Sequence, residues 1–418
     1  MKIEKKEKFL SILNQIVGIF LVIVIFTFPF PKYKQTIETI CFFIIILAFI
    51  AKWALSKIKD IDKYGNKTQR VSLNGITGTR IDLPILIFTI FIIISIFCSV
   101  DYRHSLHAFK GYWLIPILLF YIIVNFAVNK KIITYVIWAV ILSSLAPIIL
   151  GLFEYFTGVI RIKSLFGAPT EFGQYLDYIL PLMFAMVLWS EAKISKILLS
   201  FIFVGALFCL VFTYTRASWI SVLIAMFLLC FIKNKKVILI PIVLVFLLLI
   251  FSSHGVKDRV ISMTDKEHYL NRMYLFESAI EQIKKKPLTG YGWGYKNFYK
   301  LYPSFVSPEL KSIGWTQMYH AHNYPLQIAF ETGILGLMVF LWMWITTIIL
   351  TWKSFIRLKE PFLKSIAIGI FAAFIACSIH WLVEIPDAKQ LIMMLWTLIA
   401  VAMAIVNITE EKWEKKNL

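Results

Sequence analysis

Long, uninterrupted runs of apolar residues recur along the whole chain and are separated by short polar segments. A hydrocarbon core about 30 Å thick needs roughly 20 residues of helix to cross it, and continuous apolar runs favour helices over the alternating pattern of a β-barrel. The pattern predicts an all-α polytopic membrane protein that forms a single integral membrane domain over residues 1–418. About twelve transmembrane helices are expected, at roughly 9–30, 35–55, 83–100, 111–128, 132–156, 171–189, 197–214, 216–232, 237–253, 325–351, 363–384 and 388–407.

Composition agrees with this class and charge placement orients it. The 418 residues are 59% hydrophobic with a mean hydropathy of +0.77, far above that of a soluble domain. A net charge of +19 suggests nucleic acid at first sight, but the predicted inner loops hold 25 of the 43 Lys and Arg, the positive-inside pattern. We therefore expect no nucleic acid partner, both termini in the cytoplasm, and residues 254–324, between the ninth and tenth spans, outside. The first span reads as a retained helix because it has no small-residue cleavage site.

Ionisable residues at the outer ends of spans are candidate functional groups, because a charge is costly inside a bilayer and is rarely kept there without a partner. Arg216, in TYTRASWIS, lies between two apolar runs with almost no loop around it. Arg161 and Lys163 lie in the outer connection before the sixth span, and Glu171 and Asp177 follow at the beginning of that span. These cations either line a pocket for an anionic substrate or are interfacial and ion-paired residues.

Arg272 lies in the outer loop, in a segment that predicts an amphipathic helix over about 271–286 with Asn271 as its N-cap. Steps of three and four residues from Arg272 define an apolar stripe, so the arginine shares the buried face. A cation near a helix N-terminus favours an anion beside it, either an external phosphate or a carboxylate from another span. The residues of the stripe are Leu275, Phe276, Ala279, Ile280 and Ile283.

Three glycines alternate with aromatic residues in PLTGYGWGYKNFYKLYPSF, at Gly290, Gly292 and Gly294. A phosphate-binding loop is one interpretation. A turn followed by an aromatic surface at the membrane interface is favoured, because no strand precedes the glycines and no Gly-Lys-Ser/Thr follows them. The aromatic side chains that could supply stacking faces for sugars are Tyr291, Trp293, Tyr295, Phe298 and Tyr299.

Two histidines and an asparagine stand directly before the tenth span, in YHAHNYPLQ. His320 and His322 diverge by about 200° on a helix, and no carboxylate or further histidine lies near them at metal-ligand spacing, so we expect no metal site. Pro325 suits the first turn of the following helix, which leaves His322 and Asn323 at its lip. His322 is either an interfacial hydrogen-bonding group or a base that takes a proton from a hydroxyl. Asn323 either caps the helix or orients a sugar.

Together these segments resemble the O-antigen ligase and polymerase superfamily, the membrane enzymes of the WaaL type. The resemblance rests on the arginine of TYTRASW, on the Arg272 helix with its PLTGYGWG continuation, and on AHNYPLQIAFETGILGL entering the next span. It covers about residues 205–345. It implies a glycosyltransferase of the GT-C type that transfers a glycan from undecaprenyl diphosphate to an acceptor on the outer face of the bacterial inner membrane, without a metal ion or other cofactor.

Carried onto this sequence, the resemblance implies that Arg216 and Arg272 hold the lipid-linked diphosphate and that His322 is the general base. Arg161 is a further candidate for the same anionic pocket. Candidate supporting residues are Asn323, His320 and Lys163. Displacement from the opposite face of the sugar would give inversion, and cations that stabilise the leaving diphosphate would lower the barrier.

Four functions remain to be compared. The leading hypothesis is an O-antigen ligase that joins a carrier-linked polysaccharide to lipid A-core in lipopolysaccharide biosynthesis. The second is a polymerase of the same fold that extends the glycan on its carrier. A relative that glycosylates proteins is less favoured, because no sizeable soluble domain follows the twelfth span. A secondary transporter is the alternative of a different class, and it would require ionisable groups at the bilayer midplane and broken helices in matched halves.

Overall fold

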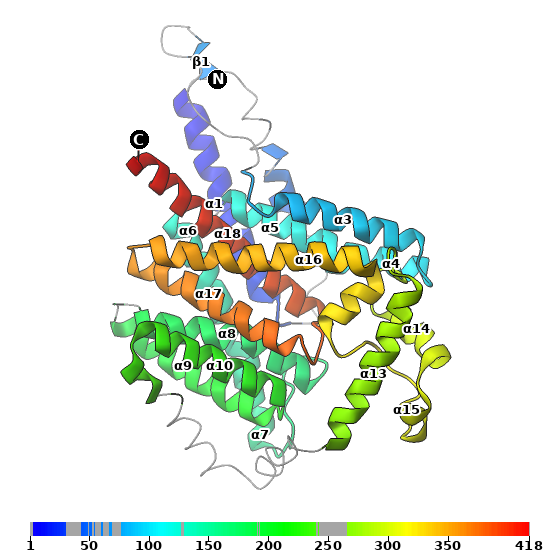
Figure 1. Cartoon of the computed structure of the whole chain (residues 1–418). Helices are drawn as coiled ribbons and strands as arrows, with labels where there is room; N and C mark the ends of the chain where they lie inside the picture. Colours follow the sequence, from blue (N-terminus) through cyan, green and yellow to red (C-terminus); the bar gives the residue numbers. More distant parts are fainter. Residues whose placement is uncertain are drawn as a thin grey trace.

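The structure is a computed structural model. It describes residues 3–30, 43–48, 77–126, 129–189, 193–239 and 266–417, together with residues 50, 51, 54, 60, 61, 67, 68, 191 and 241. Nearly all of the described chain is helical (Figure 1), apart from the two-residue strands β1 (Asp60–Ile61) and β2 (Lys67–Thr68), which pair antiparallel. The helices are α1 (Ile3–Thr27), α3 (Asp82–Phe97), α4 (Tyr102–Ala108), the π-helix η1 (Phe109–Leu114), α5 (Ile115–Phe126), α6 (Lys130–Ser143), α7 (Leu145–Phe156), α8 (Pro169–Trp189), α9 (Lys193–Phe212), α10 (Arg216–Lys233), the 3₁₀ helix η2 (Lys235–Ile238), α13 (Lys266–Lys285), α14 (Lys296–Phe305), α15 (Pro308–Ser312), α16 (Tyr324–Arg357), α17 (Pro361–His380) and α18 (Lys389–Asn417).

Most of the predicted spans are found where the hydropathy pattern places them. Ser11–Thr27 and Asp82–Phe97 are shorter apolar helices at two further predicted positions. The predicted spans 35–55 and 237–253 lie largely outside the described residues, as do residues 254–265 of the predicted outer loop. The described part of the chain is therefore that of a mainly helical, multi-pass membrane protein, while the number of twelve spans stays a prediction. The eight helical segments long and apolar enough to cross a bilayer are Tyr102–Phe126, Lys130–Phe156, Pro169–Trp189, Lys193–Phe212, Arg216–Lys233, Tyr324–Arg357, Pro361–His380 and Lys389–Glu411.

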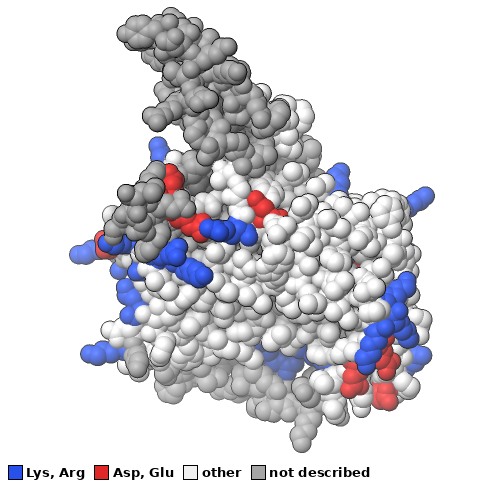
Figure 2. All heavy atoms as spheres, turned by 45° about the horizontal axis from the view of Figure 1, so that its top comes forward, with Lys and Arg blue, Asp and Glu red and all other residues white. Residues whose placement is uncertain are grey.

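The helices pack as a bundle whose interior and exterior are both apolar. α17 packs against α8 and α10, α18 packs against α5, and α16 packs against α3. Large apolar side chains also cover the outside of the bundle, such as Ile194 at 84% exposure and Phe201 at 75%, as expected for a surface that faces lipid. Figure 2 shows one face on which Lys and Arg gather toward opposite edges and the surface between them is mostly uncharged.

A second, smaller core lies at the end of the bundle where α16 begins. There α13, α14 and α15 lie together beside the first turns of α16 (Figure 1). Leu275 and Ala279 of α13 are fully buried in this core with Phe298, Tyr302 and Phe330. His322 lies just before α16, so we call this end of the bundle the His322 end. α8 and α10 also begin there, and α17 ends there.

The glycine-rich segment fills a break in α16. Gly333 has φ 80° and ψ 175°, which interrupts the helix and frees carbonyl groups. The amides of Tyr291 and Gly292 donate to the carbonyls of Phe330 and Glu331 at 2.8 and 3.1 Å. Gly292 has φ 107°, and a Cβ there would lie 2.1 Å from Cβ of Ser99. These glycines therefore permit close packing of backbones. This favours the interpretation of the segment as a turn and disfavours that of a phosphate-binding loop.

The aromatic residues after these glycines are mostly part of the packing. Tyr291, Trp293 and Phe298 are buried, at 8%, 5% and 0% exposure, so they offer no open face to a sugar. Tyr295 and Tyr299 are half-buried. Only these two of the five predicted stacking residues keep part of their surface accessible.

Candidate functional site

The segment before α16 has the local structure that the sequence predicts. The side chain of Asn323 accepts a hydrogen bond from the amide of Leu326 at 2.9 Å and caps the helix, and Pro325 occupies its first turn. Gln327, one turn into the helix, accepts from the amide of Ala321 at 3.0 Å. His322 consequently stands at the lip of α16, where the sequence places it.

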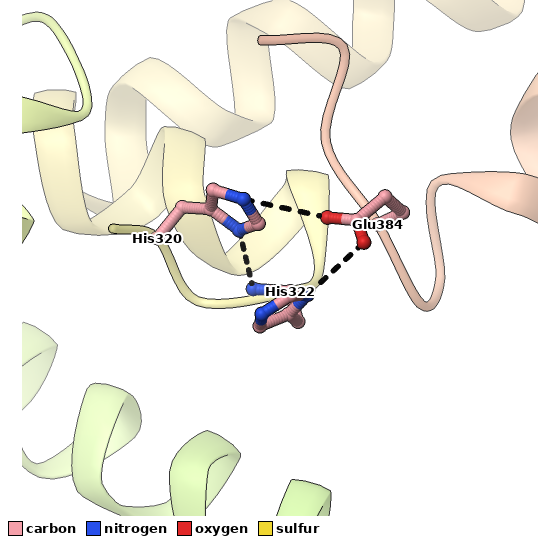
Figure 3. A group of neighbouring side chains, drawn as sticks. All are labelled: His320, His322 and Glu384. Carbon is pink, nitrogen blue, oxygen red and sulfur yellow. Dashed lines mark hydrogen bonds and ion pairs between the residues drawn. The ribbon is translucent and has the colours of Figure 1, made fainter. Parts of the chain in front are cut away.

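A carboxylate from another part of the chain joins the two histidines (Figure 3). Glu384 belongs to residues 381–388, which connect α17 to α18. Its Oε2 lies 3.1 Å from Nδ1 of His322, and its Oε1 lies 3.5 Å from Nε2 of His320. The expectation that no carboxylate accompanies the histidines is therefore wrong. Spacing within one segment cannot reveal a partner that is 62 residues away.

Backbone hydrogen bonds hold the two segments together. The amide of Tyr324 donates to the carbonyl of Trp381 at 2.8 Å, and the side-chain amide of Asn323 donates to the carbonyl of Leu382 at 3.0 Å. The amide of Ile385 donates to Oε1 of Glu384 at 3.1 Å. Asn323 thus caps α16 and also fixes the position of the loop that carries Glu384.

The charges at this site follow from burial and from the contacts just described. Burial lowers the pKa of His320 to about 4. Glu384 opposes this shift and His322 adds to it, and the ring is neutral at neutral pH. Burial on its own would raise the pKa of Glu384. The charge and hydrogen bond of His322, with a smaller effect from His320, instead hold it at about 2. Glu384 is therefore an ionised acceptor throughout the neutral range.

An ionised acceptor at Nδ1 determines which tautomer His322 adopts. Glu384 accepts from Nδ1–H, which leaves the lone pair of neutral His322 on Nε2. This second ring nitrogen points away from Glu384 in Figure 3, and no described residue is hydrogen-bonded to it. The His322 side chain is 25% exposed, so the ring is only partly covered by the protein.

Positive backbone φ angles occur at or beside three of the candidate residues. Among the described residues other than glycine, only three have positive φ: Ser164 at 56°, Tyr214 at 55° and His322 at 49°. Ser164 follows Lys163 directly, and Tyr214 lies two positions before Arg216. Backbone strain of this kind costs roughly 1–3 kcal/mol per residue and clusters at functional sites. All three positions lie at or beside residues singled out from the sequence.

A hydrogen bond links Arg161 to the segment that leads into Arg216. Nε of Arg161 donates to the carbonyl of Thr213 at 3.0 Å, and Thr213 lies three residues before Arg216. Arg216 is the first residue of α10 and is half-buried, whereas Arg161 and Lys163 are exposed. The hydroxyl of Thr215, the residue directly before Arg216, donates to the carbonyl of Pro169. This bond joins the start of α10 to the start of α8 at the His322 end.

Arg272 occupies a third position, on α13, and the prediction for this helix needs correction. The helix begins at Lys266, so Asn271 is inside it and is not its N-cap. Arg272 is half-buried. Three of the five predicted stripe residues are buried, but Phe276 is only half-buried and Ile280 is exposed. The buried face is rotated toward Ser278 and Gln282 because α13 packs against both α15 and α16.

Asp387 lies near Glu384, and Glu171 and Tyr295 lie near Asp387. Burial raises the pKa of Asp387, the carboxylates of Glu171 and Glu384 add to this effect, and a backbone hydrogen bond and His322 oppose it, which together give a pKa of about 7. Burial also raises the pKa of Tyr295, with added effects from Asp387 and Glu171. Glu384 and Asp387 were missed because WLVEIPDAK reads as an ordinary short outer loop. Two acids in so short a connection between spans were the available signal.

Asp177, predicted to lie near the outer cations, lies in the bundle interior instead. Its Oδ2 is 2.6 Å from Nδ1 of His380, and Ser221 donates to its Oδ1 at 3.1 Å. Ser218 lies 3.1 Å from the same nitrogen of His380. This group joins α8, α10 and α17 just beneath the first turn of α10, which carries Arg216.

The histidine group also has the composition of a metal site. Ligand atoms of His320, His322 and Glu384 lie within 4.8 Å of one another. The amide of His322, however, donates to Nδ1 of His320 at 3.3 Å, so the proton of neutral His320 belongs on the Nε2 that faces Glu384. A protonated nitrogen is not a metal ligand, and the hydrogen bonds favour proton transfer over metal binding here. That the site holds no metal stays a prediction.

The fold and this site define a multi-pass membrane protein with an oriented imidazole at one end of its bundle. Residues 201–341, about a third of the chain, match the O-antigen ligase family, and this match supports membership in the O-antigen ligase superfamily. The matched segment includes Arg216, Arg272 and His322, but neither Arg161 nor Glu384. Membership indicates a glycan ligase or polymerase, an enzyme that acts on lipid-linked glycans in a membrane. No curated protein matches the chain.

Proposed function

We propose that the protein is an O-antigen ligase with a GT-C type fold. It transfers a polysaccharide from undecaprenyl diphosphate to lipid A-core at the periplasmic face of the inner membrane, with inversion and without a metal ion. The family match and the helical, multi-pass architecture support this assignment. Charge placement supports cytoplasmic termini, because Lys and Arg concentrate in the loops predicted to be inside.

The observation that carries the proposal is the orientation of His322 by Glu384. A general base must present an unprotonated nitrogen toward the hydroxyl that attacks. The 3.1 Å contact at Nδ1 supports that role for Nε2, and a carboxylate behind the ring would stabilise the imidazolium that forms.

The reaction that follows is a single displacement. The acceptor hydroxyl of lipid A-core transfers its proton to Nε2 of His322, and its oxygen forms a bond to the anomeric carbon. The bond from that carbon to the diphosphate oxygen breaks from the opposite face, and its electron pair leaves with undecaprenyl diphosphate. In this scheme Arg216 and Arg272 stabilise the departing charge, and Arg161 contributes from the same outer surface.

Removing one preorganised donor for developing charge typically lowers a rate by about 10²–10³. We expect this loss for Arg216→Ala and for Arg272→Ala. Arg103 on α4 is exposed at the same end of the bundle, and Arg103→Ala is the matched control, with a rate close to that of the unchanged protein. Equal rates for all three variants, with folding intact, would remove the arginines from the mechanism.

The decisive experiment is reconstitution of the purified protein with a defined undecaprenyl-diphosphate glycan and lipid A-core. A glycan–lipid A conjugate that forms in the presence of EDTA is the expected product. Longer carrier-linked chains without conjugate would identify a polymerase instead. Loss of product in EDTA, restored by a divalent cation, would contradict the metal-independent mechanism.

A further inference from the structure

A cavity lined by several polar residues lies at the opposite end of the bundle from His322. It has a volume of about 360 Å³ and is formed by the last turns of α16, by α18 and by the segment that leads into α3. Arg80, Lys353 and Arg357 line it, with Glu410 as the only acidic residue among its lining residues. The cavity is therefore cationic, and it shares no residue with the histidine group.

The position of this cavity matches the headgroup layer of a bilayer. Beyond its break at Gly333, α16 continues over residues 334–357, which at 1.5 Å per residue is about 36 Å, longer than the hydrocarbon core of about 30 Å. The end of α16 that carries Lys353 and Arg357 therefore extends past the hydrocarbon. Leu350 lies one turn deeper on the same face and gives the cavity an apolar wall toward the membrane interior.

The cations remain able to bind an anion. Arg80 lies 3.4 Å from Glu410, but the Arg80 side chain is 65% exposed, and such surface pairs contribute roughly 0–1 kcal/mol. Lys353 is exposed and has no ion pair with any described residue. The hydroxyl of Ser354, a mostly buried residue, also lines the cavity and can donate to a phosphate oxygen.

We propose that this cavity binds the phosphate diester headgroup of an anionic phospholipid. Lys353, Arg80 and Arg357 neutralise the phosphate, and one acyl chain extends along Leu350 into the bilayer. Basic pockets between transmembrane helices at the membrane surface bind anionic headgroups in this way. The inference is independent of the reaction proposed at the His322 end.

The test uses the full-length protein in nanodiscs and native mass spectrometry to measure lipid retention. Phosphatidylglycerol is the anionic probe and phosphatidylcholine the zwitterionic one. We expect selective retention of phosphatidylglycerol, and about fivefold weaker retention in Lys353→Gln, since each Lys or Arg near the surface contributes about 1 kcal/mol. Lys359→Gln removes an exposed lysine just after α16 that does not line the cavity, and it should retain the lipid unchanged.

A separate arm distinguishes a lipid from a free anion. Inorganic phosphate is added, at constant ionic strength, to protein in nanodiscs of phosphatidylcholine alone. A rise in unfolding temperature that depends on Lys353 would identify a site for free phosphate and overturn the lipid assignment. Equal retention of the two lipids, or equal behaviour of Lys353→Gln and Lys359→Gln, would overturn the site.

Discussion

The protein contains two carboxylate–imidazole pairs with similar chemistry and very different surroundings. Glu384 and His322 meet at 3.1 Å at one end of the bundle, with side-chain exposures of 14% and 25%. Asp177 and His380 meet at 2.6 Å inside the bundle, with exposures of 2% and 1%. In both pairs Nδ1 is the nitrogen that faces the carboxylate.

The difference between the pairs lies in the second ring nitrogen. The His322 ring, which carries its Nε2 on the side away from Glu384, is partly exposed at the lip of α16. Nε2 of His380 is buried and has no hydrogen-bond partner among the described residues, while two serines complete the surroundings of Asp177. A pair that exposes a lone pair can do proton chemistry on an external hydroxyl. A sealed pair can only hold helices together, so the same residue types predict different consequences when they are changed.

The largest effect is expected for His322→Ala. Loss of the base should lower the transfer rate by about 10³-fold, within the range known for general acid–base groups. The unfolding temperature should change little, because the histidine is partly exposed. The rate per folded molecule is measured in the reconstituted assay. His107→Ala, at an exposed histidine of α4, is the control, and a rate equal to that control would show that His322 is not the base.

Asp177→Ala is expected to act on stability instead. Removing one partner of a buried pair typically costs about 3–5 kcal/mol, because the remaining partner is left buried without compensation. We expect a lower unfolding temperature in detergent, while protein that remains folded keeps a rate well above that of His322→Ala. Glu309→Ala removes an exposed carboxylate and should be neutral. An unchanged unfolding temperature together with loss of the transfer rate would show that Asp177 takes part in the reaction. The Asp177–His380 pair would then not be merely structural.

Glu384→Gln separates orientation from chemistry within the Glu384–His322 pair. The amide keeps the shape of the carboxylate but cannot stabilise an imidazolium, so we expect a fall in kcat of about 10²-fold with little change in KM. Because the pKa of Glu384 is held at about 2, its own titration should not appear in rate profiles between pH 5 and 9. Glu384→Asp should recover part of the rate. A variant with unchanged kcat would show that the contact is only structural.

Hydropathy alone could predict the spans and could not predict either pair. The span at 171–189 is observed as Pro169–Trp189, because continuous apolarity over some 20 residues leaves few alternatives for a chain in a bilayer. The partner of His322 is 62 residues away and that of Asp177 is 203 residues away. Such contacts depend on which spans pack side by side, and each span is apolar on several faces, so its pattern does not specify its neighbours.

Local signals predicted the histidine side of the site better than its carboxylate side. Pro325 and Asn323 define the start of α16 from sequence, and they correctly place His322 at its lip. The start of α13 was misplaced, since the residues before Asn271 continue the helix despite a good capping residue. The break at Gly333 is invisible to hydropathy, because a glycine inside an apolar run does not change the run.

The smallest expected effect concerns Asp387, the carboxylate near the Glu384–His322 pair. Burial raises its pKa from 3.8 to about 7 in the folded protein, so ionisation there opposes folding. The associated loss of stability should be absent near pH 4, grow as the pH rises toward 7, and stay constant above it. Asp387→Asn should therefore raise the free energy of unfolding by about 1 kcal/mol at pH 8, after allowance for partial solvation, and leave it unchanged at pH 4. Thermal unfolding at the two pH values measures this, with Glu309→Gln as the control. A gain of equal size at both would show that the carboxylate does not titrate in this range.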